Sequence, residues 1–293
     1  MIPIRALMTG LVDYAGLFPP AALDMQAAVR RYRGYLTGKD RWALGRFVVS
    51  AARLGEFKAA FNEVCCGERE RVWGLSVLAS ADEGLDTKSI SELPRGAAQV
   101  DCVEVKAADA VQAERVLTGL REEAPGTMAY VEFAPGKASA MLPVLKRFGA
   151  GAKIRTGGVT AGAFPTVETV AEFLAACARA KVAFKATAGL HHAVRGEYKL
   201  TYEPESARAT MHGFVNVFLA ALLAWRGEDA TAVRATLAEK DAAAFVFGKR
   251  DVRWLGFTAK SAEIEAVRRE FAISYGSCSF EEPVAEAKAA GWL

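Results

Sequence analysis

Short apolar runs alternate with amphipathic helical stretches along most of the 293-residue chain, and this order constrains the fold more than any single motif does. Each run ends in Gly, Pro, Asp or His, and a helical pattern follows it. Seven strands are predicted in succession, at residues 9–13, 45–50, 72–78, 100–106, 128–133, 152–156 and 182–187. Because parallel neighbours in a sheet need helical crossovers, this alternation predicts a parallel α/β fold.

An eighth strand would close the sheet into a barrel, and residues 252–257 and 271–275 are the two candidates for it. We prefer the second, because the turn-forming residues 276–279 and a helical pattern over residues 282–290 follow it. The chain is therefore predicted to form one (β/α)8 TIM barrel domain over residues 1–293, with residues 194–265 as a helical insertion between strands 7 and 8. A doubly wound sheet is the alternative fold.

Composition narrows the classes of function. Thirty-seven basic residues nearly balance 34 acidic ones, so the net charge of +3 gives no field suited to nucleic acid. The five cysteines show no regular spacing, which argues against a disulfide framework. Asp13, Pro19 and Asp24 lie where a signal peptide would be apolar, and the apolar stretch 214–225 is too short to cross a bilayer. We expect a cytoplasmic enzyme with a small-molecule substrate and without nucleic-acid or membrane partners, and the same stretch leaves a homo-oligomer open.

Two lysines lie inside short predicted strands, Lys153 on the sixth and Lys185 on the seventh. If both point into the barrel, each ammonium group disfavours the charge of the other, and burial adds to this effect. A lysine with a lowered pKa is partly neutral at pH 7 and can attack a carbonyl to form a Schiff base. The alternative is that one or both lysines reach past the barrel end and pair with a carboxylate.

Carboxylates at strand ends could act as general acids or bases. The candidates are Asp13, Asp101, Glu104 and Glu132. Because side chains alternate along a strand, Asp101 and Glu104 cannot both face inward on a regular strand. A solvated or salt-bridged carboxylate is the alternative interpretation for each of them.

Histidines and a small-residue turn follow the last two predicted barrel strands. His191 and His192 come directly after the seventh strand, and His212 precedes the helix of the insertion. A barrel places its active residues beyond the carboxyl ends of the strands, so we expect at least one histidine in the site. The turn 276–279, with Ser277 and Ser279, could bind an anion at the start of the last helix, and Gly189 could add backbone amides. Helix capping by the serines is the alternative.

Several of these segments resemble the 2-deoxyribose-5-phosphate aldolases. Residues 152–157, Ala-Lys-Ile-Arg-Thr-Gly, are similar to the Lys-x-x-Thr-Gly strand of that family, and residues 184–189, Phe-Lys-Ala-Thr-Ala-Gly, to its later lysine strand. The resemblance implies that Lys153 forms the Schiff base and that Lys185 tunes it. It also implies active-site roles for Asp13 and Asp101, and a phosphate-gripping turn at residues 274–279. The chain departs from the family in its Gly189-Leu-His-His192 loop and in the insertion.

The leading hypothesis is a carbon–carbon lyase of the class I aldolase type that acts through an iminium at Lys153 and needs no cofactor. Lys185 would lower the pKa of Lys153, while Asp101 and Asp13 would handle protons through water. The substrate would be a small anionic carbonyl compound near Gly189, Ser277 and Ser279. Arg155 shares the parity of Lys153 and would pair with its anion.

Two further hypotheses stay open at this point. One is a metal-dependent barrel isomerase, epimerase or lyase in which a divalent ion is bound by Glu104, Glu132, His191 and either His192 or His212. That reading requires Glu104 to face inward on the fourth strand, whereas the aldolase reading requires Asp101 to do so. The other is a non-catalytic barrel that binds an anion.

Overall fold

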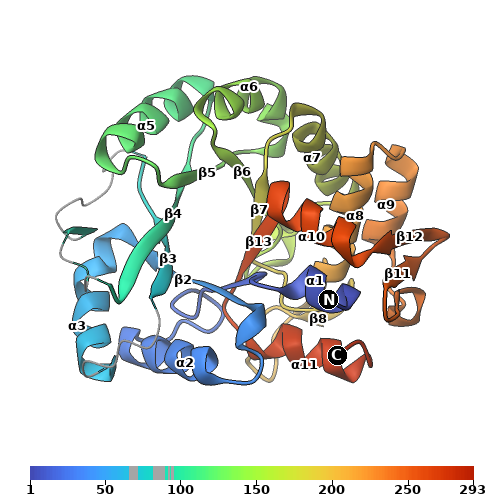
Figure 1. Ribbon diagram of the computed structural model, residues 1–293, viewed down its shortest axis with the longest axis horizontal. Helices are drawn as coiled ribbons and strands as arrows, with labels where there is room; N and C mark the ends of the chain where they lie inside the picture. Colours follow the sequence, from blue (N-terminus) through green and yellow to red (C-terminus); the bar gives the residue numbers. More distant parts are fainter. Residues whose placement is uncertain (66–71, 82–89, 92, 94–95) are drawn as a thin grey trace.

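Eight parallel strands close into a barrel in the computed structural model of the chain, which describes residues 1–65, 72–81, 90–91, 93 and 96–293. Around the barrel the strands follow the order β1, β13, β7, β6, β5, β4, β3 and β2, and all neighbours that pair do so in parallel. Helices surround this barrel on its outside (Figure 1). The predicted (β/α)8 fold is therefore confirmed, and the eighth strand is the segment that we preferred.

The barrel strands lie close to their predicted positions. Their bounds are Val12–Tyr14 (β1), Leu44–Ser50 (β2), Trp73–Leu78 (β3), Ala98–Lys106 (β4), Met128–Glu132 (β5), Gly151–Arg155 (β6), Phe184–Thr187 (β7) and Ala272–Ser277 (β13). Most of their residues are buried on both faces, as expected for a sheet with side chains packed inside it and helices outside. Polar side chains within these strands are therefore surrounded by buried, mainly apolar residues, and several of them form the site described below.

Ten described helices lie outside the barrel, and several of them begin at a capping side chain. They are Pro3–Met8 (α1), Met25–Thr37 (α2), Leu54–Cys65 (α3), Ala110–Glu123 (α5), Ala138–Phe148 (α6), Val167–Ala180 (α7), Phe214–Arg226 (α8), Ala230–Ala238 (α9), Ser261–Glu270 (α10) and Glu281–Ala289 (α11). Asp24, Asp109 and Thr166 each accept a hydrogen bond from a backbone N–H in the first turn of α2, α5 and α7. In α8 every residue from Phe214 to Ala224 is buried, which fits its nearly uniform apolar sequence.

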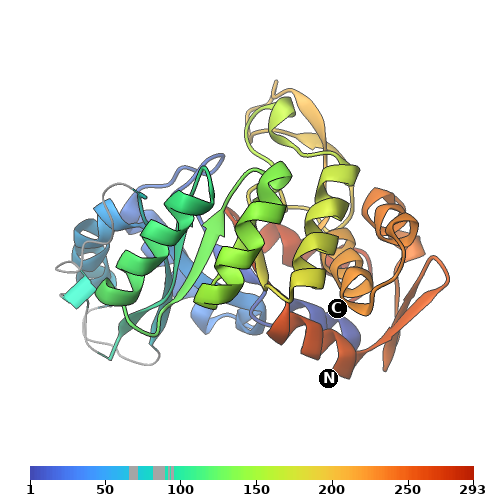
Figure 2. The same cartoon turned by 90° about the horizontal axis from the view of Figure 1, so that it is seen from above.

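The segment between β7 and α10 contains strands that the sequence analysis did not predict, as well as helices α8 and α9. A hairpin of Gly196–Lys199 (β8) and Arg208–Met211 (β9) projects from one end of the molecule (Figure 2). Val246–Phe247 (β10), Asp251–Trp254 (β11) and Phe257–Lys260 (β12) form a separate antiparallel sheet. The rejected candidate for the eighth strand, residues 252–257, spans the turn of this sheet, where Leu255 and Gly256 both have positive φ, 42° and 83°.

No helix within the described part of the chain is both long and apolar enough to span a membrane.

Candidate active site

A cavity of about 260 Å³ opens at the carboxyl ends of the barrel strands. Its lining comes from seven of the eight strands or from the residues just beyond them, including Ala15, Val48, Leu78, Glu104, Lys153, Thr187 and Gly276. This is the end at which barrel enzymes carry their active sites. The volume is small beside the roughly 300–1,000 Å³ of pockets for drug-sized ligands, so it suits a small molecule. We call it the first cavity.

The two strand lysines lie side by side inside the barrel. Lys153 on β6 and Lys185 on β7 are register partners in adjacent parallel strands, so their side chains leave the sheet in the same direction. Lys153 is 6% exposed and Lys185 only 1%. Lys153 lines the first cavity, whereas Lys185 lies below it, within the barrel core. Only the first of these two amines can therefore meet a ligand directly.

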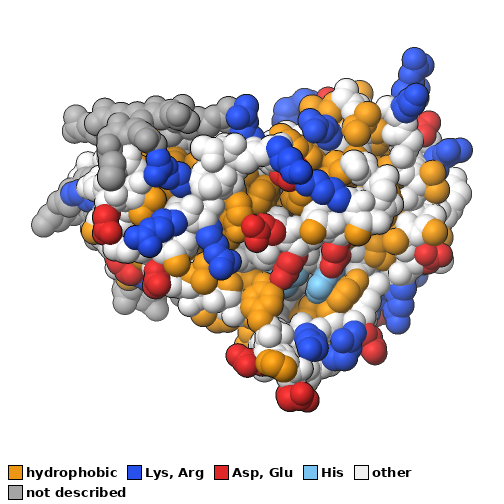
Figure 3. Space-filling view, turned by 90° about the horizontal axis from the view of Figure 1, so that it is seen from below, with side chains coloured by type: hydrophobic (Ala, Val, Ile, Leu, Met, Phe, Trp, Pro, Cys, Tyr) orange, Lys and Arg blue, Asp and Glu red, His pale blue; other side chains and the backbone are white. Residues whose placement is uncertain are grey.

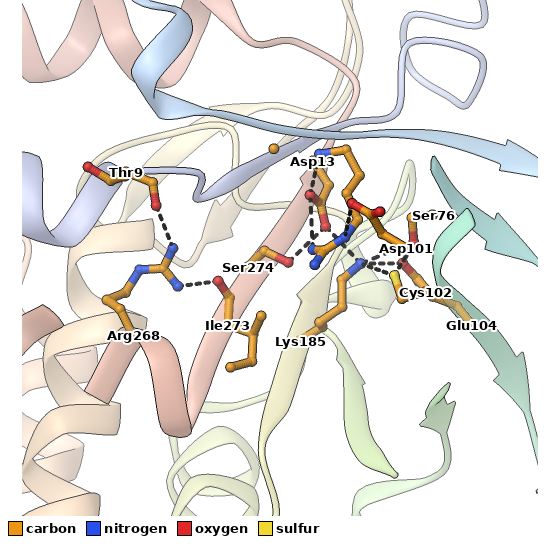
Figure 4. Close-up of polar contacts among 12 residues, drawn as sticks. Thr9, Asp13, Ser76, Asp101, Cys102, Glu104, Lys185, Arg268, Ile273 and Ser274 are labelled. Atoms are coloured by element: carbon orange, nitrogen blue, oxygen red, sulfur yellow. Dashed lines mark hydrogen bonds and ion pairs between the residues drawn. The ribbon is translucent and has the colours of Figure 1, made fainter. Parts of the chain in front are cut away.

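A single carboxylate, Glu104 on β4, joins the two lysines. Its Oε2 lies 2.8 Å from Lys153 Nζ, and its Oε1 lies 2.5 Å from Lys185 Nζ. Ser76 on β3 donates to the same Oε1 over 2.5 Å. Figure 4 shows Lys185 pointing toward Glu104, Ser76 and Cys102 on one side and toward Asp13 on the other. Glu104 thus occupies the inward position that the aldolase hypothesis gave to Asp101.

The two lysines of this cluster face two carboxylates, Asp13 and Glu104, and these opposite charges determine which of the groups carry a proton. Burial alone would lower the pKa of Lys185, but Asp13 at 2.7 Å and Glu104 raise it well above its usual value. Burial alone would raise the pKa of Glu104, but the ammonium groups of Lys185 and Lys153 lower it well below its usual range. Lys185 is therefore held protonated and Glu104 ionised. Both lysines thus pair with carboxylates, as the alternative prediction had it, but they do so inside the barrel and not beyond its end.

Asp13 on β1 is fully buried and is held from three sides. Its Oδ2 pairs with Lys185 and accepts from Ser274 Oγ at 2.7 Å, and its Oδ1 accepts from the backbone N–H of Arg46 at 2.7 Å. The Arg46 guanidinium on β2 lies 3.7 Å from the same Oδ1. Asp13 therefore anchors Lys185, and it is not among the residues that line the first cavity.

Asp101 pairs with Arg46, and no contact joins it to either lysine among those of the described residues. Its Oδ2 lies 3.6 Å from Arg46 Nε, and its Oδ1 accepts from Gln99 at 2.9 Å. The pairing of β3 with β4 is irregular: Leu75 pairs with Val100, but the next residue, Ser76, pairs with Cys102, so Asp101 has no partner on β3. This local shift and the alternation of side chains place Glu104, three residues later, among the amines.

Glu132 and Arg155 continue the charged network toward solvent. Glu132 Oε2 lies 3.1 Å from Lys153 Nζ, and its Oε1 lies 3.5 Å from Arg155 Nε. The Arg155 side chain is 54% exposed and lines the first cavity. Arg155 is thus a half-exposed cation at the cavity wall, paired with Glu132 on one side and able to bind an anionic ligand.

The loops after β6 and β7 approach each other so closely that both need glycine. A Cβ on Gly189 would lie 2.7 Å from the Cα of Gly157, and one on Gly157 would lie 2.8 Å from the Cα of Gly189. Gly189 also has φ of +76°, a conformation that side chains disfavour. Thr156 donates to the carbonyl of Ala188 and ties the two loops together. Gly189 lies on the cavity wall, as its predicted position beyond the seventh strand requires.

The three histidines lie in different surroundings. His191 lines the first cavity, and its Nδ1 is 3.1 Å from Ser277 Oγ. His192 stacks on Tyr198 and pairs with Glu286 at 2.5 Å. His212 is fully buried between the carbonyl of Pro165 and Arg195. Among the described residues, His191 is the histidine that lines the cavity of Lys153, whereas His192 and His212 do not line it.

The turn after β13 serves mainly as a helix start. Ser279 Oγ accepts from the backbone N–H of Glu282, and Ser277 Oγ accepts from that of Ser279. The first turn of α11 carries Glu281 and Glu282, which place negative charge where a phosphate would have to bind. The capping alternative therefore describes Ser277 and Ser279 better than the anion site does.

The metal hypothesis finds no matching geometry in the part of the chain that the structure describes. No group of three or more His, Cys, Asp and Glu side chains there is arranged to hold an ion. The oxygens of Glu104 pair with Lys153 and Lys185, and those of Glu132 with Lys153 and Arg155. His192 Nδ1 pairs with Glu286.

Several site residues were not singled out from the sequence. Ser76, Arg46 and Ser274 each lie in a strand that otherwise reads as apolar, and each contacts a carboxylate of the cluster. Their signal is the one that identified the lysines, a polar residue within a short strand. A lysine in a strand stands out because burying its charge is costly, whereas a buried serine costs little and does not stand out.

Comparison with known proteins adds a distant structural likeness. No protein-family model matches the chain, and no curated protein matches it. Among solved structures, it is similar to a deoxyribose phosphate aldolase from Aeropyrum pernix, which is described as having a unique tetrameric structure. The two chains are 13% identical, the match covers 64% of this chain and 80% of that one, and the TM-score is 0.44. At this level of similarity, function has to follow from the geometry of the site itself.

Proposed function

We propose that the protein is a class I aldolase-type lyase, in which Lys153 forms an iminium with a small anionic carbonyl compound. One observation carries this proposal: of two buried amines on adjacent strands, Lys153 alone lines the first cavity, at the end of the barrel where substrates bind. Lysine is otherwise seldom buried, and two such residues in one core are costly to retain.

The first chemical step requires Lys153 to lose a proton. Glu104 is a weak base for this purpose, because both ammonium groups lower its pKa. Glu132, 3.1 Å from Lys153 Nζ, is the neighbouring carboxylate that accepts the proton in our proposal. The neutral amine then adds to the substrate carbonyl, Glu132 returns the proton to the hydroxyl of the resulting carbinolamine, and that hydroxyl leaves as water to give the iminium. The iminium is the electron sink for cleavage of the next carbon–carbon bond, so no cofactor takes part in the proposed reaction.

Lys185 acts in this proposal as a positioning residue. Its permanent charge, held by Asp13, fixes Glu104 and so fixes the position of Lys153. Arg155 faces the cavity from the other side of Glu132 and pairs with the substrate's carboxylate or phosphate. The substrate is therefore a small carbonyl compound with an acidic group close to the carbonyl.

Borohydride trapping tests the proposal. We would incubate the protein with pyruvate or with acetone in the presence of sodium borohydride and map the reduced adduct by peptide mass spectrometry. We expect an adduct on Lys153, formed faster with pyruvate because of Arg155, and none in Lys153→Met. The matched control, Lys146→Met, removes an exposed lysine on α6 and should leave the adduct unchanged.

Absence of an adduct with either probe would refute the proposal. So would labelling that persists at the wild-type level in Lys153→Met, because the reactive amine would then lie elsewhere.

A further inference from the structure

A second cavity of about 290 Å³ adjoins the first and shares His191 and Pro20 with it. Its walls come mainly from the β8–β9 hairpin, with Glu282 at the start of α11. Figure 3 shows this face of the molecule, where a histidine surface lies in a hollow between hydrophobic and acidic side chains. A ligand that occupied both cavities would therefore lie against His191 and Pro20.

The second cavity has a largely apolar and aromatic wall. The side chains of this kind are Pro20, Tyr198, Leu200 and Tyr202. The cations beside them, Lys199 and Arg208, already donate to the backbone carbonyls of Pro204 and Glu197. The cavity therefore suits an apolar or aromatic group better than a strongly anionic one.

His191 is held firmly at the junction of the two cavities. Its Nδ1 lies 3.1 Å from Ser277 Oγ, 3.8 Å from Cys278 Sγ and 3.8 Å from Glu282 Oε2. We assign the Nδ1 proton to the bond with Ser277, which leaves the lone pair of Nε2 available. Burial lowers the pKa of His191 to about 4, and the charge of nearby His192 adds to this effect, while Glu286 opposes it. The ring is thus uncharged at pH 7, with a lone pair on Nε2 but with less affinity for a proton than an exposed histidine has.

Other titratable groups on the wall of the first cavity cannot take a proton so readily. Arg155 stays charged, and Glu104 is held ionised by two ammonium groups. Burial raises the pKa of the Cys278 thiol, which keeps its proton. Among the described residues that line this cavity, His191 is the one uncharged base.

We propose that His191 is the catalytic proton carrier of the aldol reaction, and that the second cavity binds the leaving aldehyde, whose body is apolar or aromatic. This inference rests on the proposed function, because it places the breaking bond relative to the iminium at Lys153. The retained half of the substrate occupies the first cavity, and the bond that breaks lies beside His191.

Each step of this proposal is balanced. The β-hydroxyl group gives its proton to His191 Nε2 as the carbon–carbon bond breaks, and the bond's electrons move to the iminium to form a neutral enamine. The aldehyde leaves through the second cavity. His191 then returns its proton to the enamine carbon, and water hydrolyses the iminium to release the second product and free Lys153.

The test separates iminium formation from bond cleavage. We would use the aldol adduct of benzaldehyde with whichever donor, pyruvate or acetone, is trapped on Lys153, and follow benzaldehyde release by absorbance. In His191→Asn we expect cleavage to fall by about 10²- to 10⁴-fold, the usual range for removing a general acid–base group, while borohydride trapping of the donor stays within about twofold. Added imidazole should restore part of the activity of His191→Ala.

The aldehyde subsite has its own test. Leu200→Trp narrows the second cavity, so cleavage of the benzaldehyde adduct should fall by about tenfold, while the acetaldehyde adduct is affected little. His212→Gln is the control for histidine replacement, since the amide can still donate to the carbonyl of Pro165 and His212 lines neither cavity among the described residues.

Two outcomes would overturn this inference without touching the proposed function. One is an iminium that forms normally in His191→Asn together with wild-type cleavage. The other is an equal loss for both adducts in Leu200→Trp. Absence of any iminium in the wild-type protein would instead refute the proposed function.

Discussion

Replacing Lys185 by methionine removes the charge that holds two buried carboxylates together. Lys185 is 1% exposed and lies 2.7 Å from Asp13 and 2.5 Å from Glu104. Methionine fills a similar space but leaves both carboxylates without this partner. Breaking a buried ion pair by removing one side costs about 3–5 kcal/mol. Asp13 keeps its bonds from Ser274 and the backbone, so we do not expect a larger loss than this.

The expected change is large enough to measure by thermal and urea unfolding. Globular proteins gain about 2.1 cal/mol/K of entropy per residue on unfolding, so the 293-residue chain should lose roughly 5–8 °C in Tm. The double variant Lys185→Met/Asp13→Asn should be less unstable than the sum of its single variants, because one of the stranded charges is then gone. The exposed control Lys146→Met should stay within about 0.5 kcal/mol of the wild type.

A Lys185→Met variant that is as stable as the wild type, or more stable, would refute this reasoning. It would mean that the free-energy cost of burying the charges of Lys185, Asp13 and Glu104 equals or exceeds the stabilisation from their ion pairs. It would also fit the non-catalytic barrel, for which the lysines are dispensable to stability.

Three further outcomes follow from the site. Arg155→Gln should raise KM for anionic donors by about tenfold relative to neutral ones, which the trapping assay measures by comparing pyruvate with acetone. An equal rise for both donors would show that Arg155 does not bind the anionic group. Gly189→Ala should destabilise the protein by more than about 1 kcal/mol, since φ is +76° and the Cβ would meet Gly157, whereas Gly162→Ala has open space; equal urea midpoints for the two would contradict the close approach. Folding lowers the pKa of Glu104, so its ionised carboxylate stabilises the protein above its unfolded pKa of about 4.3, and this contribution is lost as pH falls below that value. In Glu104→Gln, the free energy of unfolding measured in urea should therefore fall less steeply below a pH of about 4.3 than in the wild type. An unchanged pH dependence would contradict the lowered pKa of Glu104.

The fold could be predicted from the sequence because the same strand–helix pattern recurs along the chain. Seven successive strand–helix units predicted a parallel sheet, and the barrel is confirmed with residues 272–277 as its last strand. The short strands of the insertion were not predicted, apart from residues 252–257, which were considered as a candidate for the eighth barrel strand. β10 has two residues, and β11 and β12 have four each, which is too few for a period of two to be distinguished from chance.

The site was harder to predict because it depends on direction and on partners across the barrel. Parity along a strand excluded Asp101 and Glu104 from facing inward together, but it gave no reason to choose Glu104. The irregular pairing of β3 with β4 made that choice, and it involves a neighbouring strand. Two adjacent lysines suggested mutual repulsion, whereas the structure places Glu104 between them and Asp13 behind Lys185. Charge balance in a core is a property of the assembled strands, so it cannot be read from one strand at a time.

The most direct test of the account is a crystal structure of the protein after borohydride reduction with a donor that labels it. We expect continuous electron density from Lys153 Nζ into the first cavity, with the acidic group of the donor beside Arg155 and with Lys185 still paired to Asp13 and Glu104. Density for the adduct on Lys185 or on a surface lysine, with the first cavity empty, would contradict the account.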